Sequence, residues 1–204
     1  LESLNTLEEW PNKVKVMQKN WIGQSYGCEV KFKIQSQKNI KEIKCYTTRP
    51  DTLFGATYMV LAPEHTLIDA LVTDEKRAQV DAYISESAKK SDFDRTEVNK
   101  DKTGVFTGSY AINPLSQEKI EIWIADYVLM SYGTGAIMAV PAHDERDFDF
   151  AKKFSIPIRR ALVMSENDDA SQELSKAETE YGWMVNTGRD DFDGLYGNEA
   201  ITTV

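Results

Sequence analysis

The sequence predicts an α+β fold in which a curled, barrel-like β-sheet forms the core and helices lie around it. Short runs of alternating apolar and polar residues recur along the 204 residues, as in half-buried strands. Segments with helical spacing are fewer, and they do not follow the strands in a regular βαβ pattern. Together these observations predict about six or seven short strands against about three helices.

The strands follow from the apolar pattern. Residues 29–34, 40–46, 58–62, 104–112 and 119–125 alternate or are uniformly apolar. The first two runs are separated by the turn-forming residues 35–38, which predicts a hairpin. The last two predict a second hairpin.

Three segments predict helices. Pro63 fits the first position of one helix, and Thr73 or Asp74 fits the cap of a second. Residues 144–154 have helical spacing and precede a proline, which predicts a third. The charged residues 87–102 predict a loop.

The composition restricts the function. The net charge of −9 disfavours sequence-independent binding to nucleic acid through its phosphates, although contact with one nucleic-acid end is still allowed. No apolar run approaches the roughly 18 residues of a membrane helix, so we expect a soluble protein.

The two cysteines, Cys28 and Cys45, are too few for a disulfide framework. Together with the two histidines they are also too few to form a zinc site. We therefore expect a reduced cytoplasmic location. Because Leu1 is not an initiator methionine, we expect a piece of a longer protein.

Residues 46–55, Tyr-Thr-Thr-Arg-Pro-Asp-Thr-Leu-Phe-Gly, interrupt two apolar runs with hydroxyls and one guanidinium. Pro50 keeps Arg49 out of the helical region, so this strand end could form a wall for a polar ligand. An ordinary turn, in which the threonines bond their own backbone, explains the same pattern equally well.

Residues 132–147 form a second informative run. Gly133 and Gly135 allow a close backbone approach. Asp144 and Asp147 are spaced as an N-cap and the third helical residue, so both could simply cap a helix. Alternatively, at least one carboxylate projects into a pocket and holds an ammonium group, a bond worth about 1.5–3 kcal/mol.

His143 lies beside these carboxylates in the sequence. Its ordinary pKa suits a general base. A single histidine with no orienting partner is more often structural or in contact with substrate, and we favour that interpretation.

The two runs together resemble the inserted editing domain (connective peptide 1) of bacterial-type leucyl-tRNA synthetase. The resemblance covers nearly the whole chain and rests on Trp10–Pro11 with 21–23, 47–55, 102–108, 122–129, 132–147 and 185–188 with 192–195. Thr-Thr-Arg-Pro alone is only moderately specific, since valyl enzymes carry a similar run. Residues 165–180 and 189–191 depart from the expected pattern, away from the predicted pocket.

The resemblance implies an esterase that removes isoleucine, methionine or norvaline from the leucine tRNA and excludes leucine. Such a second sieve is needed because a first site rejects a near-isostere by only about 1–3 kcal/mol. By motif match, the implied catalytic residues are Thr47, Thr48 and Asp147, and the implied substrate-binding residues are Arg49, Asp51, Thr52, Tyr132, Met138, His143 and Asp144. Thr52 would exclude leucine sterically, and Asp147, with Asp144, would bind the α-ammonium. Arg49 would face the terminal adenosine.

The implied mechanism is direct attack of water on the ester, helped by the neighbouring ribose hydroxyl, with no covalent intermediate, metal or cofactor. In the parent enzyme, ATP and Mg would serve the ligase reaction. We expect an N-terminal connector (1–25), the editing domain (26–195) and a C-terminal connector (196–204). The expected partners are the 3′-terminal adenosine of mischarged tRNA(Leu) and the rest of the synthetase, with no membrane. The isolated piece should be monomeric and weakly active.

Two alternatives remain open. The domain could be a non-catalytic module that only docks the tRNA 3′ end, with the threonines and aspartates structural. It could also be a valyl-type editing domain, whose target would be threonine.

Overall fold

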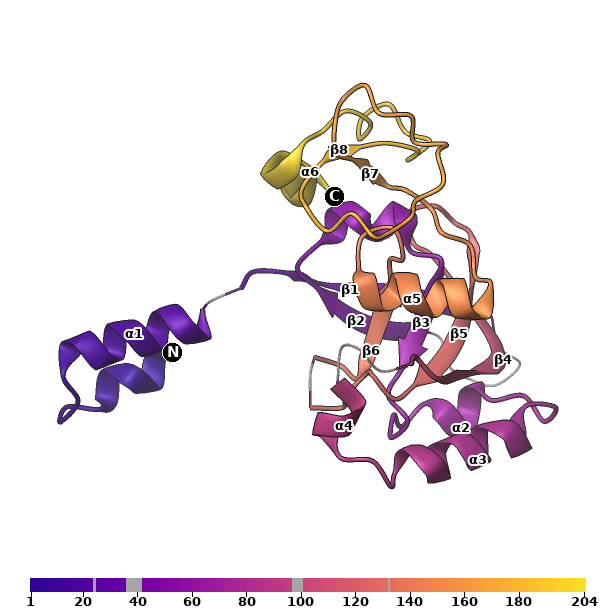
Figure 1. Cartoon of the computed structure of the whole chain (residues 1–204), viewed down its shortest axis with the longest axis horizontal. Helices are drawn as coiled ribbons and strands as arrows, with labels where there is room; N and C mark the ends of the chain where they lie inside the picture. The colour runs from indigo at the N-terminus through magenta and orange to yellow at the C-terminus, as the bar shows by residue number, and fades with distance from the viewer. Residues whose placement is uncertain (24, 36–41, 97–100, 132) are drawn as a thin grey trace.

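The computed structural model describes residues 1–204 except 24, 36–41, 97–100 and 132. A six-stranded sheet has the order β2-β1-β4-β5-β3-β6, and a two-stranded sheet pairs β7 with β8 (Figure 1). The strands are β1 (Cys28–Gln35), β2 (Glu42–Thr47), β3 (Tyr58–Leu61), β4 (Gly104–Ile112), β5 (Lys119–Ala125), β6 (Ala136–Ala139), β7 (Leu162–Val163) and β8 (Trp183–Met184). The helices are η1 (Glu2–Thr6), α1 (Asn12–Ile22), η2 (Pro50–Gly55), α2 (Ile68–Leu71), α3 (Arg77–Ser87), α4 (Asp92–Thr96), α5 (Glu145–Phe154) and α6 (Gly197–Thr203).

The large sheet is curled, which confirms the predicted fold class. Its pairs are antiparallel except β3 with β5. The edge strands approach each other where Thr134, just before β6, donates a hydrogen bond to the carbonyl of Lys44 in β2 at 2.8 Å. No ladder joins β2 to β6 in the described residues, so the barrel does not close. Gly108, at φ +86°, marks the irregularity in β4, where a Cβ would collide with Thr73.

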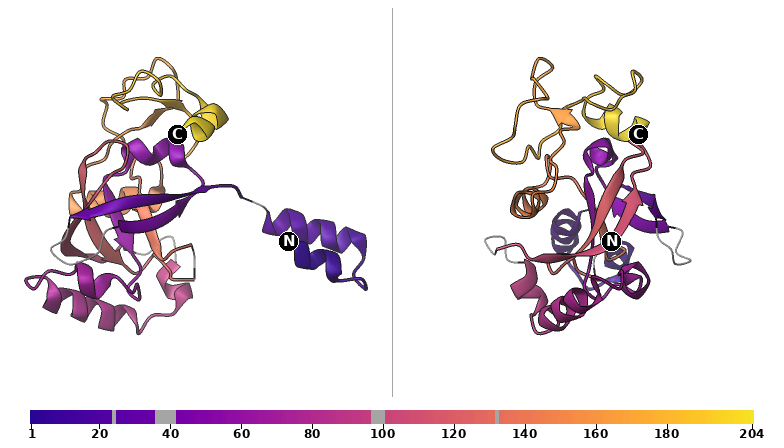
Figure 2. Two further views of the ribbon diagram at one scale, coloured as in Figure 1. Left: turned by 180° about the vertical axis from the view of Figure 1, so that it is seen from behind. Right: turned by 90° about the vertical axis from the view of Figure 1, so that its right-hand side faces the viewer.

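Helices cover the sheet on different sides. Figures 1 and 2 show α2, α3 and α4 at one end, and the small sheet with α6 at the other. Apolar side chains of the sheet and of α2 and α3 fill the main core. The ring centre of Phe150 in α5 lies 5.3 Å from that of Tyr58 in β3. The ring centre of Phe54 in η2 lies 5.5 Å from that of Phe192. Helix α5 thus packs on β3, and the C-terminal residues pack on η2.

The predicted strands agree with the structure. The ranges 104–112 and 119–125 are confirmed, and residues 144–154 form α5 with Asp144 as its cap. Residues 36–38 of the predicted turn and 40–41 of the following strand lie outside the described residues.

The prediction of a helix that begins at Pro63 was wrong. Residues 63–67 form turns and the helix begins at Ile68, because His65 accepts a hydrogen bond from the amide of Leu67 at 3.1 Å and so competes with a helical ladder. The second helix begins at Arg77, and neither Thr73 nor Asp74 caps it.

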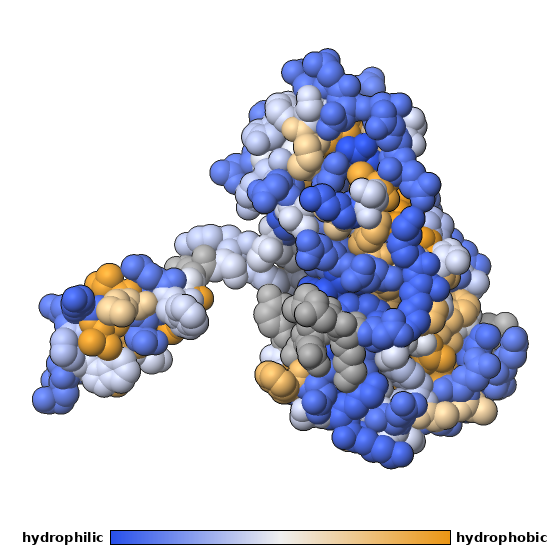
Figure 3. Space-filling view, in the orientation of Figure 1, coloured by the Kyte–Doolittle hydropathy of each residue, from blue (hydrophilic) through white to orange (hydrophobic). Residues whose placement is uncertain are grey.

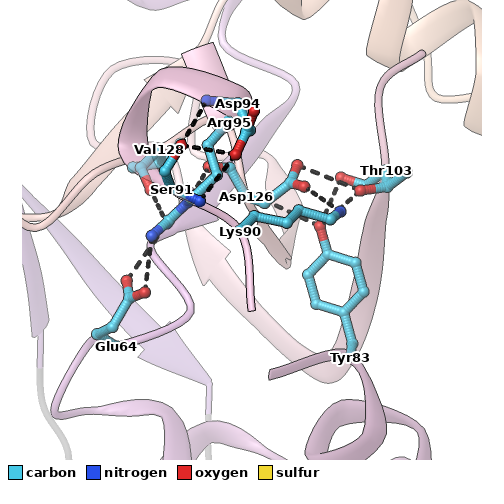
Figure 4. Close-up of polar contacts among 9 residues, drawn as sticks. All are labelled: Glu64, Tyr83, Lys90, Ser91, Asp94, Arg95, Thr103, Asp126 and Val128. Atoms are coloured by element: carbon cyan, nitrogen blue, oxygen red, sulfur yellow. Dashed lines mark hydrogen bonds and ion pairs between the residues drawn. The ribbon is translucent and has the colours of Figure 1, made fainter. Parts of the chain in front are cut away.

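The predicted loop at 87–102 was wrong in part, because α3 extends through Ser87 and α4 spans Asp92–Thr96. Residues 88–91 and 101–102 are not helical, and residues 97–100 lie outside the described residues. Distant contacts stabilise this segment. Arg95 donates to the carbonyls of Asp126 and Val128 and pairs with Glu64 at 2.8 Å, as Figure 4 shows. Lys90 pairs with the buried Asp126 at 2.7 Å. We call these residues, with Tyr83 and Thr103, the β5-end cluster.

Residues 1–22 form a helical arm that stands away from the rest of the chain (Figures 1 and 2). The arm exposes apolar side chains, and Trp21 is 88% exposed. Figure 3 shows these apolar residues gathered on the arm. Among the helices of the described residues, none is long and apolar enough to cross a membrane.

Candidate functional site

A pocket of about 210 Å³ lies where residues 46–55, which we call the threonine stretch, meet the junction of β6 and α5. Its walls comprise Tyr46, Thr47, Thr48, Arg49, Thr52, Ile137, Met138, Val140, His143, Asp144, Arg146 and Asp147. Eight of the ten predicted site residues therefore come together. Asp51 lies outside this wall, and Tyr132 lies outside the described residues.

The second half of the threonine stretch forms the short helix η2, whose residues Pro50–Gly55 are all buried, while Thr47 ends β2. Proline at the first position suits its fixed φ. The hydroxyl of Thr52 donates to the carbonyl of Arg49 at 2.8 Å, and the hydroxyl of Thr47 accepts from the amide of Arg49 at 3.0 Å. Because the Thr52 hydroxyl is engaged, its contribution to the pocket is mainly steric.

Arg49 is held in one orientation. Its guanidinium bonds both carboxylate oxygens of Asp51 at 2.9–3.2 Å, and Asp51 is only 1% exposed. It also donates to the carbonyls of Thr179 and Glu180 and lies 4.6 Å from the ring centre of Tyr181. Asp51 thus holds the guanidinium through a buried ion pair, and residues 179–181 contact it as well.

The two aspartates differ in role. Asp144 caps α5, accepting from the amides of Arg146 at 2.9 Å and Asp147 at 3.2 Å, and it also pairs with the Arg146 guanidinium. Asp147 does not complete a capping box. Its carboxylate accepts from the amide of Val140 at 2.9 Å and from the phenol of Tyr127 at 3.0 Å. The capping interpretation therefore describes Asp144, while Asp147 turns into the protein beside the pocket.

Asp147 is 3% exposed. Burial, reinforced by the negative charge of Asp144, raises the pKa of its carboxyl to about 7, although the bonds from Val140 and Tyr127 and the charge of Arg146 lower it. Near neutral pH this site can therefore hold a carboxylate whose negative charge is incompletely compensated. A cationic group entering the pocket would favour the ionised form.

His143 joins the pocket to the chain that follows α5. Its Nε2 accepts from the amides of Ala161 and Leu162 at 3.1 and 3.2 Å, and its Nδ1 lies 3.1 Å from the carbonyl of Glu178. Burial lowers the pKa of the imidazole to about 4. The ring is therefore neutral near pH 7, with both nitrogens engaged, an arrangement suited to support rather than proton transfer.

Sequence reasoning missed five residues at or near the pocket: Tyr46, Tyr127, Ile137, Val140 and Arg146. Ile137 and Val140 adjoin the predicted Met138, so the strand pattern could have included them. Tyr127 carries no local signal, because only the fold brings it to Asp147, 20 residues away.

No group of three histidine, cysteine, aspartate or glutamate side chains that could hold a metal ion occurs among the described residues. A larger hollow, about 500 Å³, lies between α5 and residues 170–174. It shares no lining residue with the pocket, and we place the site at the smaller pocket because a buried carboxylate and several hydroxyls converge there.

Comparison with known proteins gives the same family at each level. The family described as leucyl-tRNA synthetase, editing domain, matches residues 19–204. The chain is 50% identical to a leucine–tRNA ligase of Borrelia turicatae (strain 91E135) over 203 residues, covering 98% of this chain and 23% of that protein. It is 52% identical to that of Clostridium botulinum (strain Hall) over 204 residues, covering 100% of this chain and 24% of that protein. The chain thus spans about a quarter of the length of these relatives.

A solved structure is also similar. The ternary complex of agnB2 LeuRS from Agrobacterium radiobacter K84 with tRNA and LeuAMS matches with a TM-score of 0.65 and 42% identity. The match covers 78% of this chain and 19% of that chain.

Proposed function

Because the chain belongs to the family of leucyl-tRNA synthetase editing domains, we propose that it hydrolyses the ester of tRNA(Leu) mischarged with isoleucine, methionine or norvaline. The observation that carries this proposal is the buried Asp147 carboxylate at the wall of a small pocket that Thr52 also lines. The pocket is smaller than the roughly 300–1,000 Å³ typical of drug-sized ligands, which suits an amino-acid moiety.

Asp147 binds the α-ammonium of the ester in this proposal. The carboxylate receives only neutral donors from its two direct partners, Val140 and Tyr127, so its charge is available to a ligand. A charged hydrogen bond of this kind contributes about 1.5–3 kcal/mol. Asp144 contributes by capping α5 and engaging Arg146.

Thr52 excludes leucine. Its hydroxyl is engaged with the carbonyl of Arg49, so the buried, branched side chain presents a fixed obstacle. A clash with the γ-branch of leucine needs to cost only about 1.4 kcal/mol for tenfold discrimination. Met138 lines the same pocket and shapes the remaining apolar space.

Hydrolysis proceeds by direct attack of water. Thr47 and Thr48 lie beside the ester and orient water or stabilise the oxyanion, and the ribose hydroxyl shares the proton transfers. Arg49 faces the terminal adenosine or its phosphate, and Asp51 acts through Arg49. Tyr132, which lies outside the described residues, belongs to the pocket lining by motif match. His143 supports the pocket wall and contacts the substrate by its ring edge. The editing step needs no metal or cofactor, whereas ATP and Mg serve the parent's ligase reaction.

We also propose that residues 26–195 are the editing domain, and that 1–25 and 196–204 connect it to the rest of a cytoplasmic synthetase. The exposed apolar residues of the arm fit a surface that docks on the missing part. The isolated piece is then monomeric and deacylates tRNA slowly, since most tRNA contacts lie elsewhere. Equal turnover by the piece and the full-length enzyme would contradict this division.

The test is hydrolysis of isoleucyl- and leucyl-tRNA(Leu) by the full-length enzyme with and without Thr52→Ala. We expect the wild type to hydrolyse only the isoleucyl ester and the variant to hydrolyse the leucyl ester at least tenfold faster than the wild type. Thr57→Ala is the matched control, because Thr57 does not line the pocket and its hydroxyl bonds no other described group. If the wild type hydrolyses neither ester, the editing proposal fails and the domain is instead the non-catalytic module that docks the tRNA 3′ end. Preference for threonyl-tRNA(Val) would indicate the valyl type.

A further inference from the structure

Tyr127 is a buried polar residue that the proposed mechanism does not use. It follows β5 directly and is 5% exposed. Its phenol donates to Oδ1 of Asp147 at 3.0 Å. The neighbouring phenol of Tyr58, in β3, donates to the main-chain carbonyl of the same aspartate at 3.0 Å. The turn after β5 and the strand β3 thus hold one residue of α5, the first through its side chain and the second through its backbone.

These contacts fix the orientation of the carboxylate. Oδ1 accepts from Tyr127 and Oδ2 accepts from the amide of Val140 at 2.9 Å, so rotation about the side chain would break one bond or the other. Each oxygen keeps a second lone pair that can accept from a ligand.

The charged groups around this carboxylate do not replace the phenol. Asp144 and Arg146, on the same helix start, pair with each other at 3.2 Å. From the sheet side, the titratable groups that face Asp147 are the phenols of Tyr127 and Tyr58. In the part of the chain that the structure describes, Tyr127 is therefore the side chain that donates a hydrogen bond to the carboxylate and so supports its ionised form.

We infer that Tyr127 is a positioning residue of the editing site, which holds the Asp147 carboxylate ionised and oriented toward the α-ammonium of the substrate. This inference rests on the proposed function. Since a donor to an ionised carboxylate favours ionisation, loss of the phenol should make the carboxyl harder to ionise. The substrate would then bind more weakly at neutral pH, while the chemical step, once the substrate is bound, changes less.

The experiment compares the full-length enzyme with its Tyr127→Phe variant in hydrolysis of isoleucyl-tRNA(Leu) from pH 6 to 8.5, corrected for spontaneous ester hydrolysis. We expect the acidic limb of kcat/KM to move up by about one to two pH units, with most of the loss in KM. At pH 7.5 this is a loss of about three- to 25-fold that recovers as the pH rises. A merely structural role would lower the rate equally at every pH.

The matched control is Tyr83→Phe, which removes a half-buried phenol that bonds Thr103 and the amide of Asp126 away from the pocket. Its pH profile should equal that of the wild type. A monofluorinated tyrosine at position 127 serves as a second variant, because a more acidic phenol should move the limb down. This variant keeps the test informative if Tyr127→Phe does not fold.

The outcomes separate the two proposals. If the wild type hydrolyses the ester, Asp147→Ala abolishes hydrolysis and neither change at Tyr127 moves the limb, the positioning role is overturned and the editing function stands. If the wild type does not hydrolyse the ester, the proposed function itself fails.

Discussion

Two buried aspartates near the end of β5 have different surroundings. Asp126, 6% exposed, lies in the β5-end cluster, where Lys90 contacts it at 2.7 Å and Thr103 donates at 3.2 Å. Asp147, 3% exposed, is in direct contact with neutral donors, Tyr127 and Val140, and its nearby arginine is paired with another carboxylate. The fold itself pairs the Asp126 carboxylate with a cation, Lys90. It leaves the Asp147 carboxylate available to a cation of a ligand.

This difference separates a carboxylate that fastens the fold from one that serves a site. A buried charge without a partner costs stability, and such costs are retained where a ligand uses them. Both aspartates are buried and hydrogen-bonded, so burial alone would not distinguish them. The two are distinguished by a cation of the protein in direct contact with the carboxylate, which Asp126 has in Lys90.

The largest effect should follow from Asp147→Asn, which removes the charge and keeps the shape. The native carboxyl has a pKa of about 7 against an ordinary value of 3.8, so between these values the native state binds a proton that the unfolded state does not. The free energy of unfolding of the wild type therefore falls as pH rises from about 4 to about 7. The variant should be more stable at pH 8 by up to about 4 kcal/mol and lose this dependence. Denaturant unfolding at pH 5 and pH 8 measures it.

The same variant should lose hydrolysis by about 10- to 150-fold, the equivalent of one charged hydrogen bond. Stability and activity then move in opposite directions at one residue. A variant that is less stable than the wild type at pH 8 would contradict the comparison, because Asp147 would then fasten the fold as Asp126 does.

Asp126→Asn should have the opposite stability effect. It leaves Lys90, whose side chain is 21% exposed, without its partner and weakens the attachment of α3 and α4 to the end of β5. Breaking a buried pair costs about 3–5 kcal/mol, and we expect about 1–3 kcal/mol here because Lys90 reaches solvent. Denaturant unfolding measures the loss, and hydrolysis by the folded variant should remain within about twofold of wild type. Activity that falls as far as in Asp147→Asn would show that this cluster also serves the site.

The sequence could predict the elements whose signals are local. The strands at 104–112 and 119–125 follow from alternation, and Asp144 follows from cap spacing. Helix α4 could not be predicted, since Arg95 stabilises it through groups about 30 residues away. The start of α2 could not be predicted either, because the side chain of His65 bonds the backbone.

The pocket was only partly predictable for the same reason. The motifs indicate Thr52 and Asp147, but which aspartate caps and which faces the pocket depends on Tyr127 and Val140. Spacing along a helix gives the face of a residue. It does not give the donors that other strands bring to that residue.

The smallest effect should come from Asp144→Asn. Asparagine caps a helix about as well as aspartate, so α5 keeps its start, while the charge that raises the pKa of Asp147 is removed. Arg146, released from its partner, adds a favourable charge nearby. The pKa of Asp147 should therefore fall from about 7, by less than about one unit because Asp144 is partly exposed. Carboxyl NMR titration of the chain measures it, with Asp149→Asn, farther along α5, as a control. An unchanged or higher pKa would mean that burial alone sets the ionisation of Asp147, and the comparison with Asp126 would then depend on solvation rather than on neighbouring charges.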